Sequence, residues 1–166
     1  MNKNVIIVDE KDNKIGLASK EEIKEKGLIH RSVHLMLFNS NGELCVQKRA
    51  ITKKIYPGKY EFSVNGTVDN EDYDLAIKRE TQEELGIKDL KFEKLFKYYH
   101  ADEQDKAFKM VYRSKSDQKL VPDKREIDEI IWMSLDFLKK DIIENPKKYG
   151  PTFIVGIKEY FKRYKE

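Results

Sequence analysis

The sequence contains a single cysteine, Cys45, so no disulfide can form within the chain. It also lacks any apolar run near the roughly 20 residues that a membrane-spanning helix needs, and we expect no membrane association. The first ten residues, MNKNVIIVDE, become acidic too soon for a secretory signal. These absences favour a protein of the reducing cytoplasm.

Neither sign of charge dominates the chain. It has 33 basic and 30 acidic residues, which leave a formal net charge of +3. A balance this close gives no electrostatic case for nucleic-acid binding. Aromatic and basic residues alternate in KEYFKRYK near the C-terminus, but the aromatic ones keep helical spacing. We therefore interpret this segment as a docked amphipathic helix.

The order of the predicted elements favours a mixed α/β architecture. The strand-like segments RSVHLMLF and ELCVQKR flank the turn NSNG and predict one hairpin, and LKFEKLFKYYH with AFKMVYRS predicts another. A helix is predicted from residue 72 to residue 85, where Gly86 ends it, and two more helices follow near the C-terminus. No linker interrupts the 166 residues. We expect a single domain, residues 1–166, with an α/β (α+β) fold and a mixed sheet.

The predicted central helix carries an unusual group of charges. Glu80, Glu83 and Glu84 lie at i, i+3 and i+4, where like charges repel by roughly 0.2–0.5 kcal/mol per pair. At about 100° per residue, all three continue the line of the apolar face that Tyr73 and Ile77 begin. Carboxylates on an inward face need compensation, and three oxygen donors suit Mg²⁺ or Mn²⁺. The alternative explanation is a solvated surface, which is common in chains rich in lysine and glutamate.

The segment NGTVDNEDYDLAIKRETQEELGI, residues 65–87, resembles the Nudix box. An arginine, three glutamates and a glycine match in type and spacing: Arg79, Glu80, Glu83, Glu84 and Gly86. Nudix enzymes use this loop–helix–loop to hold metal ions against a diphosphate. The resemblance implies a Nudix α/β/α sandwich with this helix at its centre and helices at its C-terminal end. It also implies Mg²⁺ or Mn²⁺ as the cofactor, bound by the three glutamates.

The segment before the box narrows the resemblance. Residues 28–66 are similar to the Nudix branch that includes isopentenyl-diphosphate isomerase. In those isomerases a cysteine transfers a proton and a nearby histidine holds a metal, but here Asn65 and Thr67 stand at the matching positions. The glutamates that a hydrolase needs are all present. We therefore expect diphosphate hydrolysis, with isomerase chemistry as the alternative.

The resemblance also implies roles for individual residues. Catalytic roles fall to Glu83, Glu80 and Arg79, and substrate binding falls to Arg49 and Lys53, which match basic residues that grip a diphosphate. Arginine suits bidentate phosphate contact, and lysine acts as a point charge.

The general base is expected either in the box or on a later loop. Glu126 and Glu129, in DKREIDEIIWMS, match the segment that follows the active-site loop, and Glu103 is a further candidate. Among them we assign Glu129 to the catalytic group.

The prediction is a metal-dependent pyrophosphohydrolase for a small-molecule diphosphate, of the nucleoside-diphosphate type or a related metabolite. A non-catalytic, metabolite-sensing Nudix module is the alternative from another functional class. The intact set of glutamates favours the enzyme, because a binding module does not need it. Homodimers are frequent in this family, so the resemblance allows one here.

Overall fold

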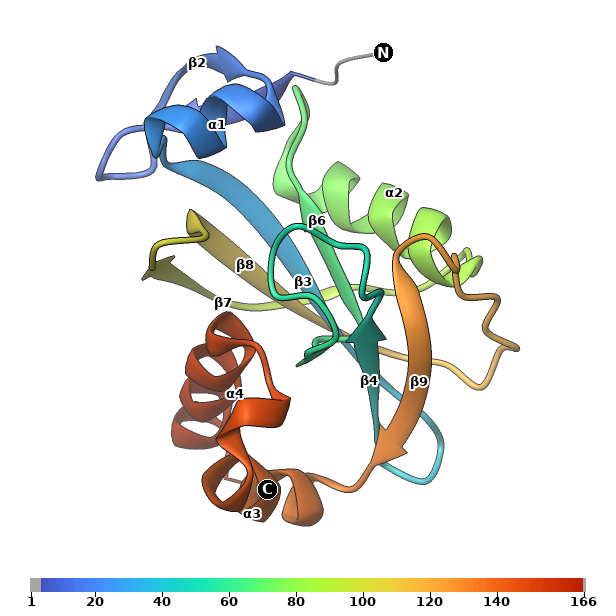
Figure 1. Ribbon diagram of the computed structural model, residues 1–166. Helices are drawn as coiled ribbons and strands as arrows, with labels where there is room; N and C mark the ends of the chain where they lie inside the picture. Colours follow the sequence, from blue (N-terminus) through green and yellow to red (C-terminus); the bar gives the residue numbers. More distant parts are fainter. Residues whose placement is uncertain (1–3, 166) are drawn as a thin grey trace.

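The computed structural model describes residues 4–165 (Figure 1). Its helices and strands, in chain order, are β1 Val5–Val8, β2 Lys14–Ala18, α1 Lys20–Lys26, β3 His30–Phe38, β4 Leu44–Arg49, β5 Tyr60–Glu61, β6 Val64–Thr67, α2 Tyr73–Leu85, β7 Glu93–Ala101, β8 Lys106–Lys115, β9 Ile127–Met133, α3 Leu135–Glu144, a short 3-10 helix Pro146–Lys148, and α4 Pro151–Arg163. The two predicted hairpins, the central helix and the C-terminal helices all form.

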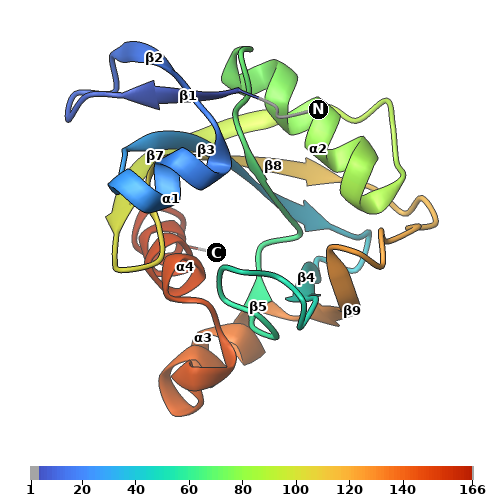
Figure 2. The same cartoon turned by 45° about the horizontal axis from the view of Figure 1, so that its top comes forward.

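The strands of the described residues form one nine-stranded mixed sheet. Strand β3 lies inside it, antiparallel to β1, β4 and β6 and parallel to β8. Helix α2 covers one face, and α3 and α4 lie on the other (Figures 1 and 2). The expected sandwich with a mixed sheet is therefore confirmed.

Strand β3 contributes to the core on both faces because its side chains alternate. Val33, Leu35 and Leu37 pack in the apolar cluster that includes Ile77 of α2. Met36 and Phe38 pack in the opposite cluster with residues of α3 and α4. A continuous apolar strand of this kind is typical of a sheet covered on both faces.

The hairpin of β3 and β4 opens soon after its turn. The two strands are in register only at Phe38 and Leu44, and then β6 pairs with β3 while β5 and β9 pair with β4. Ser63, between β5 and β6, joins the diverging strands. Its hydroxyl accepts from the backbone N–H of Leu37 at 2.9 Å and donates to the carbonyl of Cys45 at 2.6 Å. One side chain thus replaces backbone pairing where the strands separate.

The boundaries of α2 follow from local chemistry. The side chain of Asp72 accepts from the backbone N–H of Leu75 at 2.8 Å and caps the first turn. At the other end Gly86 takes a left-handed conformation, with φ of 67°, and terminates the helix. The predicted start and stop of the helix are both confirmed.

The last helix docks as its aromatic spacing predicted. Phe153, Ile157 and Tyr160 of α4 are fully buried against the sheet. Cys45 is likewise buried as a small core residue. No helix within residues 4–165 is long and apolar enough to cross a membrane.

Candidate active site

Helix α2 turns two of its three box glutamates inward. Glu84 is only 3% exposed, and the side chain of Glu80 is 13% exposed. The side chain of Glu83 is 48% exposed, so it does not share the inward arc that the helical spacing predicted for it. The buried face instead continues through Thr81, which is 1% exposed.

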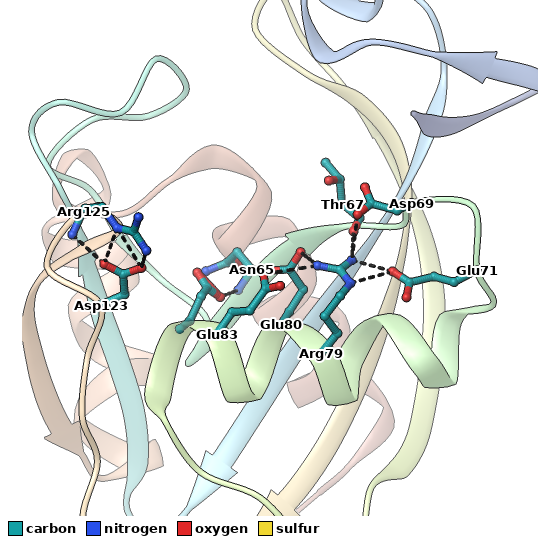
Figure 3. A network of polar contacts seen from close by, with 10 residues as sticks. Asn65, Thr67, Asp69, Glu71, Arg79, Glu80, Glu83, Asp123 and Arg125 are labelled. Atoms are coloured by element: carbon teal, nitrogen blue, oxygen red, sulfur yellow. Dashed lines mark hydrogen bonds and ion pairs between the residues drawn. The ribbon is translucent and has the colours of Figure 1, made fainter. Parts of the chain in front are cut away.

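Arg79 organises the acidic side chains of the helix (Figure 3). Its guanidinium donates to Glu71 at 2.9 Å, to Glu80 at 2.6 Å and to the carbonyl of Thr67 at 3.1 Å. It also reaches Glu83, four residues further along the helix, at 3.3 Å. Arg79 therefore links the loop before the helix to two of the box glutamates.

Glu84 is the most strongly perturbed group of the box. Burial raises the pKa of its carboxyl group well above the usual value, and the neighbouring charge of Glu80 raises it further. One side-chain oxygen accepts from the backbone N–H of Asn65 on β6 at 2.9 Å, which opposes part of this shift. Burial also raises the pKa of Glu80, although Arg79 acts in the opposite direction. Two carboxylates are thus held close together with little water.

Gly66 gives Glu80 its position against β6. A Cβ atom built on Gly66 would lie 2.2 Å from the carboxyl carbon of Glu80. A side chain at this position would have to displace the carboxyl group of Glu80, so the glycine leaves room for that group against β6. Gly66 could have been identified from the sequence, because it lies in the box segment, residues 65–87.

The loop before β9 is attached to the end of α2. The backbone N–H of Val121 donates to the carbonyl of Leu85 at 2.8 Å, and that of Asp123 donates to the carbonyl of Glu84 at 2.9 Å. Asp123 is also held by Arg125 in the same loop (Figure 3). This attachment brings the next acidic residue, Glu126, near enough for its charge to raise the pKa of Glu84.

The expected phosphate-binding residues lie on this same side. Lys53 forms an ion pair with Glu126, with 2.5 Å between Nζ and Oε2, and both side chains are partly exposed. Arg49 donates to the carbonyl of Ile55 at 2.8 Å, and its charge acts on the carboxyl group of Glu84. The structure therefore brings both basic residues towards the box.

Glu129 is placed differently. It lies exposed on β9, opposite Lys48 of β4, and its charge acts on the Tyr60 hydroxyl. No contact with a box glutamate is seen for it among the described residues. Of the two carboxylates expected in this segment, Glu126 is the one that faces the box.

The box glutamates match the chemistry of a hard divalent cation. Glu80 and Glu84 provide carboxylate oxygens, and their raised pKa values show that the pair needs positive charge nearby. Within residues 4–165, no three side chains of His, Cys, Asp or Glu already converge as a complete set of metal ligands. Arg79 currently pairs with Glu80 and Glu83, so metal binding requires these side chains to change partners.

A second polar group, which sequence reasoning did not connect to the site, lies on the α4 face of the sheet. We call it the inner cluster; its members are His30, His34, Glu61, Asp105 and Lys109. Lys109 forms an ion pair with Asp105, which also lies 3.4 Å from His30. Burial lowers the pKa of both imidazoles, and burial raises the pKa of Glu61 to about 7 against the opposing charge of Arg49.

Tyr56 lies in the loop between β4 and β5 and joins this loop to the turn between β7 and β8. Its hydroxyl donates to Asp102, and its backbone N–H donates to the side chain of Gln104 at 3.2 Å. Tyr56 has a positive φ of 47°, which is uncommon for a bulky residue. The side chain is only 4% exposed, and the buried contact holds this conformation.

Comparison with known proteins identifies related sequences and folds. A family model of the NUDIX domain matches residues 28–153. An uncharacterized Nudix hydrolase of Pseudomonas aeruginosa is 37% identical over 154 residues, covering 92% of this chain and 90% of that protein. A prenyl-diphosphate phosphatase of Methanosarcina mazei is 32% identical over 159 residues, covering 93% of each chain. A crystal structure of a Deinococcus radiodurans protein superposes with a TM-score of 0.80 at 21% identity, covering 95% of this chain and 98% of that one.

Proposed function

Because the chain belongs to the Nudix family and is a hydrolase of diphosphate bonds, we propose that it is a pyrophosphohydrolase dependent on Mg²⁺ or Mn²⁺. The observation that carries the metal dependence is the buried pair of Glu80 and Glu84, held close together at the edge of β6. Arg79 contacts only Glu80 of this pair, whereas a divalent ion can bind both carboxylates.

Different residues would bind the metal, position the metal ligands and bind the diphosphate. Glu80, Glu83 and Glu84 would hold the metal, which supplies positive charge to the phosphoryl oxygens. Arg79 is a positioning residue, because it orients Glu80 through their 2.6 Å contact. Arg49 would bind the oxygens of the diphosphate in both the ground state and the transition state.

Glu126 is our choice for the general base. Water attacks one phosphorus atom, its proton passes to Glu126, and the bond from that phosphorus to the bridging oxygen breaks. Lys53 now neutralises Glu126, and transfer of Lys53 to the arriving diphosphate would free the carboxylate to accept the proton. This assignment replaces Glu129, which lies on an exposed part of β9.

The substrate is a small-molecule diphosphate, and two classes are supported for the group attached to it. The family resemblance supports a nucleoside-diphosphate type. The Methanosarcina mazei relative is a prenyl-diphosphate phosphatase, which supports an apolar group as the second candidate. A homodimer, which is frequent in the family, is an assembly that the resemblance allows.

Phosphate release tests the proposal across substrate classes. We expect Mg²⁺- or Mn²⁺-dependent cleavage of at least one nucleoside diphosphate, nucleotide sugar, dinucleotide or prenyl diphosphate, and its loss in EDTA. Glu126→Gln should lower kcat by about 10²–10⁴-fold, whereas Glu129→Gln should stay near wild type. Metal-dependent binding of these compounds without turnover would instead identify a sensing module.

The isomerase alternative has its own assay. Neither Asn65 nor Thr67 can supply the proton-transferring thiol or the metal-binding imidazole of the isomerases. Isopentenyl diphosphate should therefore give no dimethylallyl diphosphate above background, and robust conversion would reverse our assignment.

A further inference from the structure

The inner cluster has no part in the mechanism above, yet it concentrates titratable groups in the protein interior. Glu61 is 1% exposed, Lys109 2% and His34 3%. Charged residues are almost never buried this deeply unless they are paired or functional. Lys109 has its ion-pair partner in Asp105. Glu61 and His34 do not have such partners, and they need an explanation.

Four side-chain atoms of these two residues lack a well-formed hydrogen bond within residues 4–165. The carboxylate of Glu61 has only a weak contact with the backbone of Phe62, and the ring of His34 has only a weak contact with the side chain of Asn65. Nearly all buried polar atoms in folded proteins have a partner, because an unsatisfied one is costly. Two buried side chains so poorly paired in one cluster therefore point to a ligand that pairs with them.

The cluster adjoins the box through strand β6. His34 of β3 stands directly opposite Asn65 in the strand register, and the backbone N–H of Asn65 donates to Glu84 at 2.9 Å. The side chain of Asn65 donates to the carbonyl of Phe62, whose ring stacks on His34 with centroids 4.6 Å apart. The charge of Arg49 also acts on both Glu84 and Glu61, so the box and the inner cluster lie close enough to contact one substrate.

Glu61 is fixed in place by the start of α4. A Cβ atom built on Gly150 would lie 1.8 Å from Oε1 of Glu61, so the carboxylate lies directly against the glycine backbone. The helix N-terminus beyond it carries a partial positive charge, which favours a carboxylate there. The position of Glu61 is therefore built into the fold.

The charges around Glu61 indicate what kind of group it accepts. Arg49 and Lys109 oppose the upward shift of its pKa, and Asp105 adds to that shift. Two basic and two acidic side chains already balance. A ligand group entering here needs hydrogen-bond donors but no net charge.

We propose that Glu61 and His34 recognise the part of the substrate that is not phosphate, and that this part is a neutral group bearing N–H or O–H donors. The sugar and the base of a nucleotide share this chemistry. A prenyl chain does not, and it would leave the polar atoms of both residues unpaired, which a binding site built for hydrogen bonding penalises strongly. The inference rests on the proposed function and selects between its two substrate classes.

Steady-state kinetics on CDP, ADP-ribose and geranyl diphosphate tests the inference. We expect the wild type to prefer the two polar substrates. Glu61→Gln should lower kcat/KM for its preferred polar substrate by about 10- to 100-fold, mainly through KM, because the lost contacts exist before the reaction. His34→Phe, which keeps the ring stacking, should act in the same direction. Cleavage of geranyl diphosphate should not decrease in either variant.

Asp141→Asn is the matched control, since Asp141 is a buried acid on α3 that bonds Tyr149 at 2.6 Å, outside the site. It should leave the substrate preference unchanged. A wild-type preference for geranyl diphosphate, or an equal loss on all three substrates in Glu61→Gln, would overturn the inference.

Calorimetry separates this inference from the proposed function. In metal-free buffer, AMP or CMP should bind the wild type more tightly than geranyl monophosphate, and Glu61→Gln should remove the difference. If no diphosphate is cleaved but this pattern holds, the hydrolase proposal fails and the inference stands. If diphosphates are cleaved but neither the binding nor the kinetics depends on Glu61, the inference alone fails.

Discussion

At the scale of single residues, Glu61 couples folding to pH. Burial raises the pKa of its carboxyl group from 4.5 to about 7 in the folded protein, against the charges of Arg49 and Lys109. Between these two values the folded state holds a proton that the unfolded chain has released. The contribution of Glu61 to stability therefore falls as the pH rises from 4.5 to about 7, and it stays low above that range.

Glu61→Gln should remove this dependence, because the amide has nearly the same shape and no charge. We expect the free energy of unfolding of the variant to exceed that of the wild type by about 1–3 kcal/mol at pH 8, and the two to converge near pH 4.5. Urea denaturation at several pH values measures the difference. A constant difference across the range would show that Glu61 does not titrate as described. A stabilised variant with reduced substrate selectivity would indicate that function maintains the carboxylate.

Gly66 makes a different residue-scale prediction. In Gly66→Ala the new methyl group would displace Glu80, whose carboxyl carbon lies 2.2 Å from its position. We expect kcat to fall by about 10²-fold, since small displacements of catalytic groups have effects of this size. Gly16→Ala is the control, because its Cβ would meet Ile7 at an ordinary 3.6 Å. Equal activity of both variants would argue against the placement of Glu80.

At the scale of elements, α2 combines a stable apolar face with an unfavourable acidic one. Glu84→Gln removes a buried charge that Glu80 repels, while its side-chain oxygen can still accept from Asn65. We expect the metal-free variant to unfold at a higher temperature than the metal-free wild type. Mn²⁺ should raise the Tm of the wild type and have much less effect on the variant. Equal stabilisation of both proteins by Mn²⁺ would place the metal elsewhere.

Strands β3 and β4 depend on Ser63 where they separate. Ser63→Ala removes a hydroxyl that bonds both strands and leaves a buried N–H and a buried carbonyl without that partner. We expect a loss of about 1–3 kcal/mol in the free energy of unfolding. Hydrogen exchange should show faster exchange at the Leu37 amide. Exchange unchanged at that amide would mean that the serine does not join the strands.

The sequence predicts an element well when the contacts that determine it join residues close together in the chain. The ends of α2 are set by Asp72 and Gly86, and both were readable directly from the chain. The opening of the β3–β4 hairpin was not, because it depends on bonds from Ser63 to residues 26 and 18 positions away. For the same reason the burial of Glu61 could not be predicted from the sequence, since it depends on contact with the distant Gly150 at the start of α4.

In the candidate active site, too, the sequence predicted the features that depend on neighbouring residues and missed those that depend on tertiary contacts. The box supplied Arg79 and its glutamates as a group, but the spacing alone placed Glu83 on the inward face, and the structure places it at the rim. Glu126 and Glu129 lie three positions apart and could not be ranked from the sequence. The attachment of their loop to the end of α2 separates them, and that attachment is a tertiary contact.

At the scale of the whole molecule, the parallel pairing of β3 with β8 sets the order of assembly. Every pair in its register, from His30–Ala107 to Phe38–Lys115, joins residues that are 77 positions apart. The intervening chain contains β4, β5, β6 and α2 with the box residues, and from the inner cluster it contains Glu61 and Asp105. Closing so long a loop is entropically slow, and chains dominated by such contacts fold slowly. During synthesis, this strand pair cannot form until β8 has emerged, so a nascent chain that already contains the entire box still has no substrate site.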